Sequence, residues 1–160
     1  MGRPFSKLSS NDKSQTFLTD THSVACYPLK EIPGSLGKMK PTILIVEDHG
    51  GMPGLILDLL SEAFPKGNFL EAKNGEEAVD LARGRSLDIV LMDLGLPKMN
   101  GIEATRRIKV AVPESHVVIV TNHEGADFQR AATIAGASAY ICKRQMETEL
   151  IAVLTKLFPG

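Results

Sequence analysis

The chain has few of the features that mark metal-binding, secreted or membrane-spanning proteins. Its 160 residues include two cysteines, Cys26 and Cys142, which lie far apart and form no CxxC or Cys/His cluster. Neither a zinc site nor a disulfide framework is therefore indicated. No apolar run reaches the roughly 18 residues that span a bilayer, and the amino terminus lacks the apolar segment of a secretory signal. We expect a soluble, cytoplasmic protein.

An excess of positive charge is also missing. Eighteen basic and 19 acidic residues leave a formal net charge of -1, which gives no support to broad attraction for nucleic acid or acidic membranes. The sequence contains no GxxxxGK[ST] loop, no GxGxxG fingerprint and no DxDxT-like acidic motif, which disfavours a nucleotide-binding protein, a flavin protein or a phosphatase. We expect no direct nucleic-acid or membrane binding and no conventional enzyme.

Two regions of different composition divide the chain. Residues 1–40 are rich in Ser, Thr, Lys, Gly and Pro, show no sustained hydrophobic period and carry a net charge of +3, whereas residues 41–160 carry -4. We predict a flexible N-terminal tail over 1–40 and one globular domain over 41–158. Met39, just before the first strand pattern, is a candidate natural start. Because the sequence ends soon after the last helix pattern, we expect it to signal through this domain's own surface.

From residue 42 onward, short apolar runs alternate with longer helical patterns. The runs at 43–46 and 89–92 are almost continuously apolar, as expected for parallel strands that are covered on both faces. This alternation predicts a doubly wound α/β domain. The expected strands are 42–46, 68–71, 88–92, 116–120 and 139–142, and the expected helices are 53–64, 75–83, 101–110, 125–135 and 145–157.

Polar residues follow several of the predicted strands. Glu47 and Asp48 end the first strand, Asp93 the third and Thr121 the fourth, and Lys143 follows the fifth. Ligands of open parallel sheets bind beyond the carboxyl ends of the strands, so we expect one polar cluster there.

Three carboxylates at one edge would repel one another unless a cation compensates for their charge. A hard ion with oxygen ligands is the natural partner, and Mg²⁺ binds with a few carboxylate or carbonyl oxygens while it keeps several waters. Asp48 and Asp93 are the first candidates for direct ligands, and Mn²⁺ is the alternative ion.

Four segments together resemble response-regulator receiver domains. They are Ile45-Val46-Glu47-Asp48-His49, the stretch from Leu91 to Gly101 that contains Asp93-Leu94-Gly95-Leu96-Pro97, the pair Val120-Thr121, and the stretch from Gly136 to Lys143. The resemblance covers residues 41–158 and is closest to receivers of LuxR-type regulators. It implies a five-stranded parallel sheet with the strand order 2-1-3-4-5, as in CheY-like and flavodoxin-like folds.

The same resemblance implies roles for individual residues. Mg²⁺ would be bound by Asp48, Asp93 and the backbone carbonyl of Gly95, with Glu47 acting through water. Asp93 would accept a phosphoryl group from a sensor histidine kinase or a phosphotransfer protein, in a two-component system or phosphorelay, while Lys143 neutralises the phosphoryl oxygens.

The resemblance also implies a conformational switch. Thr121 would donate a hydrogen bond to the new phosphoryl group, and Tyr140 would rotate into the space that this movement leaves. The surface that changes would comprise residues 124–157, where a downstream protein or a second copy of the chain would bind.

Other readings remain open at this point. The chain could be a constitutive receiver-like interaction module, or the truncated receiver of a LuxR-type DNA-binding transcription regulator. Tyr140 could be only a half-buried core aromatic. His49 and His123 flank the predicted pocket, but no third ligand with suitable spacing supports zinc.

Two departures from the receiver pattern carry their own predictions. Gly50 and Gly51 make the entry to the first helix unusually flexible, which predicts weaker Mg²⁺ affinity because ordering glycine costs more entropy. Gly95 lies two residues beyond Asp93 and has no side chain to shield a phosphoryl group, which predicts a short-lived phosphorylated state.

Overall fold

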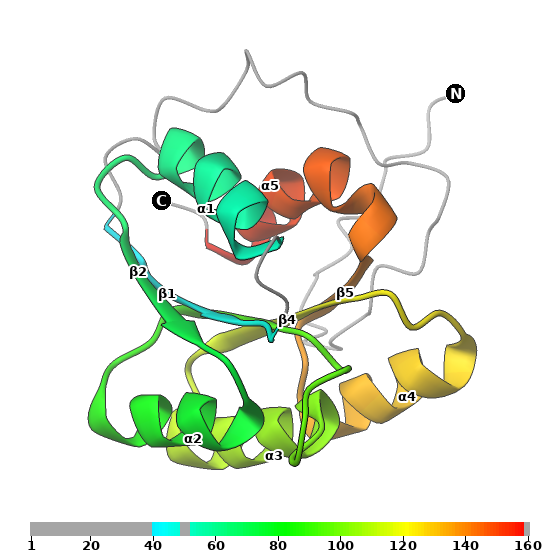
Figure 1. The fold of residues 1–160 in the computed structure, drawn as a ribbon. Coiled ribbons are helices and arrows are strands. Elements are labelled where there is room, and N and C mark those ends of the chain that lie inside the picture. The colour runs from blue at the N-terminus through cyan, green and yellow to red at the C-terminus, as the bar shows by residue number, and fades with distance from the viewer. Residues whose placement is uncertain (1–39, 49–51, 159–160) are drawn as a thin grey trace, which may run out of the picture.

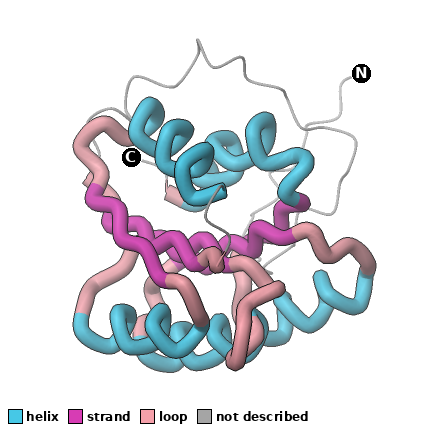
Figure 2. Tube along the Cα trace, in the orientation of Figure 1, coloured by secondary structure: helices cyan, strands magenta, loops and turns pink. Residues whose placement is uncertain are grey.

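A computed structural model describes residues 40–48 and 52–158. Residues 1–39 of the tail predicted over 1–40, which include the candidate start at Met39, lie outside these ranges, as do the loop residues His49, Gly50 and Gly51. The described chain has three layers, with a sheet between two groups of helices (Figures 1 and 2).

The central sheet has five parallel strands in the order β2-β1-β3-β4-β5. This order and the doubly wound α/β class confirm the prediction. The strands are β1 (Thr42–Val46), β2 (Asn68–Ala72), β3 (Ile89–Met92), β4 (His116–Thr121) and β5 (Ala139–Cys142).

Helices cover both faces of the sheet. Figure 1 shows α1 and α5 on one face and α2, α3 and α4 on the other. Their bounds are α1 (Met52–Ala63), α2 (Gly75–Gly84), α3 (Gly101–Ala111), α4 (Ala126–Ala135) and α5 (Met146–Leu157), and a 3-10 turn over Lys143–Gln145 leads into α5. Among the described residues, none of these helices is long and apolar enough to cross a membrane.

Two hydrophobic clusters lie on opposite sides of the sheet because successive side chains of a strand alternate between its faces. Leu44 and Val46 of β1 pack with α2 and α3, whereas Ile43 and Ile45 pack with α1 and α5. All four side chains are almost completely buried. Burial on both faces explains the continuous apolar runs that predicted parallel strands.

Local capping sets several helix ends. Asn74 and Asn100 cap the starts of α2 and α3. Their side chains accept hydrogen bonds from the N–H groups of Glu77 and Glu103, in the first turns of these helices. Gly136 ends α4 in the left-handed conformation, at φ 99°, where a side chain would be strained. Asparagine at a helix start and glycine just after a helix end are local signals that the sequence carries, and each predicted element lies within a few residues of its observed bounds.

Candidate functional site

The register of the sheet brings the ends of β1 and β3 together. Val46 pairs with Met92, and the Asp93 N–H donates to the Val46 carbonyl at 3.1 Å. The residues that follow, Glu47 and Asp93, therefore extend from neighbouring strands at the same edge. Thr121 pairs with Cys142 in the same way, so Lys143 emerges at this edge as well.

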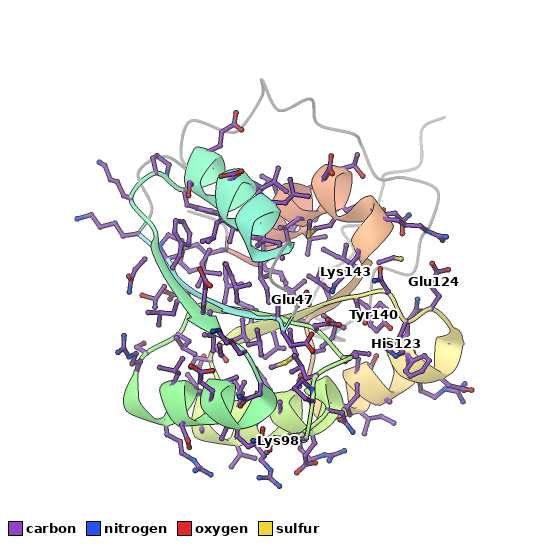
Figure 3. All side chains as sticks on the ribbon, in the orientation of Figure 1. Glu47, Lys98, His123, Glu124, Tyr140 and Lys143 are labelled. Atoms are coloured by element: carbon purple, nitrogen blue, oxygen red, sulfur yellow. The ribbon has the colours of Figure 1, made fainter. Side chains whose placement is uncertain are left out.

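Lys143 lies between two of the predicted acidic residues. Its Nζ is 2.6 Å from Glu47 Oε2 and 2.9 Å from Asp93 Oδ2. The three side chains are only 3 to 6% exposed, and Figure 3 labels Glu47 and Lys143 in the region between the sheet and α5. The ammonium group thus compensates for charge that would otherwise be costly to bury.

Burial and the lysine shift the pKa values of this trio in different directions. Burial raises the pKa of Glu47, against the opposing hydrogen bond from Lys143. Burial alone would raise the pKa of Asp93 too, but hydrogen bonds from Lys143 and the Gly95 N–H outweigh it and lower that pKa. Burial acts to lower the pKa of Lys143, and its two carboxylate partners raise it instead. The Asp93 carboxyl is therefore ionised at neutral pH.

The second oxygen of Asp93 faces the loop that follows β3. Asp93 Oδ1 accepts a hydrogen bond from the Gly95 N–H at 3.1 Å. A methyl group built at Gly95 would lie 3.9 Å from this oxygen and 3.5 Å from the His123 ring. Gly95 therefore leaves space beside the carboxylate, and the His123 imidazole borders that space.

Three carboxylates lie close enough together to hold a metal ion. Glu47, Asp48 and Asp93 each offer an oxygen within 4.8 Å of the other two, and Asp48 is exposed whereas the other two are buried. With one lysine beside them, they retain an excess of negative charge when ionised. Hard oxygen donors of this kind fit Mg²⁺.

Thr121 lies at the carboxyl end of β4 and is completely buried. Its Oγ1 is 3.2 Å from His123 Nδ1 and accepts a hydrogen bond from the His123 N–H at 3.3 Å. The sequence had suggested His123 only as a weak metal ligand. Among the described residues it belongs to no metal cluster, and it makes polar contacts with Thr121 and Tyr140.

Tyr140 joins β5 to the loop after β4. Its hydroxyl donates to the His123 carbonyl at 2.8 Å, its ring packs against the cluster beneath α2 and α3, and Figure 3 shows Tyr140 beside His123. Burial, with nearby Cys142 and the carboxylates of Asp93 and Glu124, raises the pKa of the phenol to about 12. The phenol is therefore a hydrogen-bond donor throughout the neutral range.

Two residues around Asp93 were not singled out by the sequence. Lys98 has a positive φ of 64°, a left-handed conformation that costs a residue with a side chain about 1–2 kcal/mol. Gly101 begins α3 so close to the β3 end that an added methyl group would lie 2.1 Å from the Asp93 carbonyl oxygen. The Asn-Gly pair at 100–101 was the available signal for Gly101, whereas no pattern marks Lys98.

Gly101→Ala should therefore disturb the Asp93 loop. We expect it to lower the free energy of unfolding by about 3 kcal/mol, because the clash is with backbone atoms that cannot turn aside. Gly84→Ala, at the end of α2, is the matched control, since nothing lies within 4 Å of its added methyl group. Chemical denaturation measures both, and equal stabilities of the two variants would contradict this account.

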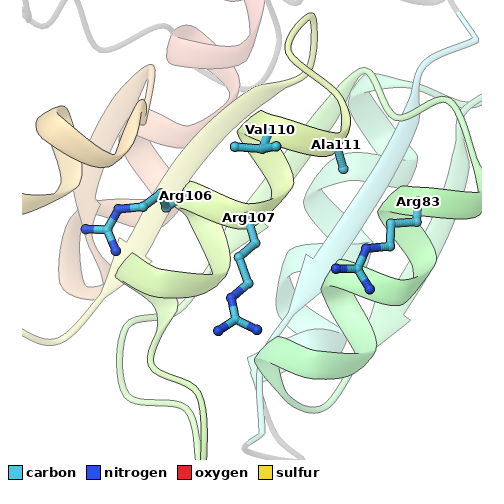
Figure 4. Close-up of a pocket in the computed structure, with 5 residues that line it drawn as sticks. All are labelled: Arg83, Arg106, Arg107, Val110 and Ala111. Carbon is cyan, nitrogen blue, oxygen red and sulfur yellow. The ribbon is translucent and has the colours of Figure 1, made fainter.

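A separate surface hollow lies between α2 and α3 and contains none of the predicted site residues. Figure 4 shows its lining, which is Arg83, Arg106, Arg107, Val110 and Ala111. Glu103 pairs with both α3 arginines, and Asp80 pairs with Arg83. Exposed pairs of this kind contribute little to stability.

Comparison with known proteins agrees with the geometry of the Asp93 edge. The family model described as the response regulator receiver domain matches residues 43–155. A putative transcriptional regulator of Pseudomonas aeruginosa is 33% identical over 118 residues, which cover 74% of this chain and 56% of that protein. The chemotaxis protein CheY of Halobacterium salinarum is 35% identical over 105 residues, 66% of this chain and 86% of that protein.

A solved structure shares the same architecture. A two-component response regulator of the LuxR family from Aurantimonas superposes with a TM-score of 0.66 at 36% identity, over 71% of this chain and 81% of that one. The chain spans about half the length of several of the curated relatives it matches.

Proposed function

This chain belongs to the response regulator receiver family, and from that premise we propose that Asp93 is its phospho-acceptor. Receiver domains serve two-component signalling as phospho-acceptors. The observation that carries the assignment to Asp93 is its buried, lysine-paired carboxylate with a lowered pKa at the carboxyl edge of the sheet.

The chemistry follows from the residues around Asp93. An Asp93 carboxylate oxygen attacks the phosphorus of a phosphohistidine donor, an oxygen–phosphorus bond forms as the phosphorus–nitrogen bond breaks, and the donor imidazole leaves with the electron pair. Lys143 is already 2.9 Å from Asp93 and stabilises negative charge on the phosphoryl oxygens. Positioning and charge account for most catalysis in phosphoryl transfer.

The cation belongs to the proposal as well. Asp48, Asp93 and the Gly95 carbonyl would hold Mg²⁺, with Glu47 acting through water and Mn²⁺ as the alternative. The cation, when bound, would offset charge on the transferring phosphoryl group. What supports this assignment is the set of three carboxylates with oxygens within 4.8 Å.

The proposed switch uses Thr121 and Tyr140. Thr121 would donate its hydroxyl proton to the phosphoryl group, and Tyr140 would respond through its bond to the loop after β4. A switch of this kind operates only if the phosphoryl group binds one arrangement better than the other. Residues 124–157 are the proposed surface for a downstream protein or a second copy of the chain.

Receiver domains exchange phosphoryl groups with histidine kinases or phosphotransfer proteins. A partner of that class is therefore the proposed donor, and the cytoplasm the proposed compartment. A second candidate function is the receiver part of a DNA-binding regulator, which the similarity to a putative transcriptional regulator favours. An open reading frame that continues into a DNA-binding segment would support it.

Intact-mass measurement tests the acceptor. The full chain is incubated with Mg²⁺ and a small acyl phosphate, beside Asp93→Asn and the exposed control Asp127→Asn. We expect the native chain and the control to gain one phosphoryl mass and Asp93→Asn to gain none. If none of the three gains mass, and beryllofluoride does not bind either, the constitutive interaction module becomes the better account.

A further inference from the structure

The proposed phospho-acceptor chemistry assigns no role to His123, yet this residue contacts several residues around the site. Its imidazole Nδ1 and its N–H both contact Thr121 Oγ1, and its carbonyl accepts from Tyr140. Its ring also meets the Phe128 ring in an edge-on contact, with centroids 5.0 Å apart. One residue thus touches both proposed switch residues and the first turn of α4.

The hydroxyl of Thr121 carries one proton. The hydroxyl oxygen already accepts a hydrogen bond from the His123 backbone N–H. When the imidazole is protonated on Nε2, Nδ1 is an acceptor, and the Thr121 hydroxyl can donate its proton to it. A hydroxyl that donates to Nδ1 cannot donate to a phosphoryl oxygen at the same time. Because Thr121 is completely buried, bulk water is not an alternative partner for its hydroxyl.

We propose that His123 is a positioning residue that competes with the phosphoryl group for the Thr121 hydroxyl and transmits the outcome to Phe128. This inference rests on the proposed function. While Thr121 donates to His123, the imidazole stays against Phe128. When Thr121 turns to the phosphoryl group, His123 loses this partner and its ring is released from a fixed position.

Phe128 is suited to report this change. It lies in the first turn of α4 and is 41% exposed, and residues 122–130 are exposed throughout. An aromatic edge-on contact is directional, so a movement of the His123 imidazole changes the preferred orientation of the Phe128 ring. The His123–Phe128 contact therefore links Thr121 to the helix that begins the proposed docking surface.

The test measures the affinity of the full chain for beryllofluoride, a phosphoryl mimic, in the presence of Mg²⁺. His123→Phe keeps an aromatic ring but removes the bond to Thr121, and we expect it to bind roughly three- to tenfold more tightly, the range of one net hydrogen bond. His123→Asn places a polar group near the Nδ1 position and should restore native affinity. His116→Phe, at the opposite end of β4, is the matched control and should leave the affinity unchanged.

A double-mutant cycle tests the second half of the proposal. Phe128→Leu should tighten binding about twofold in the native chain, because it loosens the ring that holds His123, and should have no effect in the His123→Phe chain. An equal effect in both chains would overturn the link to Phe128. Unchanged or weaker binding by His123→Phe would overturn the competition, because removal of a competitor for the Thr121 hydroxyl should tighten binding. If the native chain does not bind beryllofluoride, the phospho-acceptor function itself fails.

Discussion

Lys143→Met should lower the free energy of unfolding at pH 7 by about 3–5 kcal/mol, the usual cost of removing one partner from a buried ion pair. The substitution removes the ammonium that lies 2.6 Å from Glu47 and 2.9 Å from Asp93. Both carboxylates would then lie almost buried without the ammonium group between them. Lys156→Met, on an exposed position of α5, is the control and should change stability little.

The effect should depend on pH in a defined direction. Loss of the Lys143 hydrogen bonds removes an influence that lowers the pKa of both Glu47 and Asp93. A carboxylate whose folded pKa is raised destabilises the fold above that pKa, and the penalty fades as the pH falls through it. The difference between Lys143→Met and the native chain should therefore be largest near neutrality and shrink in acid.

The native trio has its own pH limits. The lowered pKa of Asp93 contributes stability above its unfolded value, and this contribution is lost as the pH falls through the folded value. The raised pKa of Lys143 contributes stability below its unfolded value, and this contribution is lost as the pH rises through the folded value.

The double variant Glu47→Gln/Lys143→Met should recover part of the stability that Lys143→Met loses at pH 7, because one of the two buried charges is then gone. Chemical denaturation measures the recovery. No recovery would contradict the role assigned to the buried charge.

Mg²⁺ should stabilise the native chain by about 2.7 kcal/mol at one hundred times its Kd, because a ligand that binds only the folded state adds RT ln(1 + [L]/Kd). Asp48→Asn should lose most of this stabilisation, since it removes an exposed member of the carboxylate cluster. Thermal unfolding with and without Mg²⁺ measures the effect, and isothermal titration calorimetry supplies the Kd.

Asp127→Asn is the matched control for the Mg²⁺ experiment, because its side chain is 96% exposed on α4. It should respond to Mg²⁺ as the native chain does. An equal response of Asp48→Asn would contradict the proposed ligand set. The same titration tests the weaker affinity predicted from Gly50 and Gly51, whose loop lies outside the described residues, and tight binding would count against it.

The sequence predicted the architecture because its signals are local and repeated. The apolar runs at β1 and β3 are buried on both faces, and Asn100 and Gly136 mark helix ends with their own hydrogen bonds or backbone conformation. The convergence of Glu47, Asp93 and Lys143 followed from a rule about the carboxyl ends of parallel strands.

The contacts of individual side chains could not be predicted in the same way. Whether Glu47 meets Lys143 directly depends on rotamers set by the packed surroundings, which no periodic pattern records. His123 could be judged from the sequence only by ligand spacing, yet its contacts to Thr121 arise from the turn that follows β4. The roles of all the predicted site residues remain predictions, those of Thr121, Tyr140 and the Gly95 carbonyl among them, as does a short lifetime of the phosphorylated state beside Gly95.

Mapping the phosphoryl group to a residue tests the central claim most directly. The chain is phosphorylated with an acyl phosphate in Mg²⁺, digested under conditions that preserve an acyl phosphate, and its peptides are sequenced by tandem mass spectrometry. The account predicts one modified residue, Asp93, beside the Lys143 that lies 2.9 Å from its carboxylate. A phosphoryl group on Asp48, on Glu47 or on any histidine, serine or threonine, with Asp93 unmodified, would contradict it.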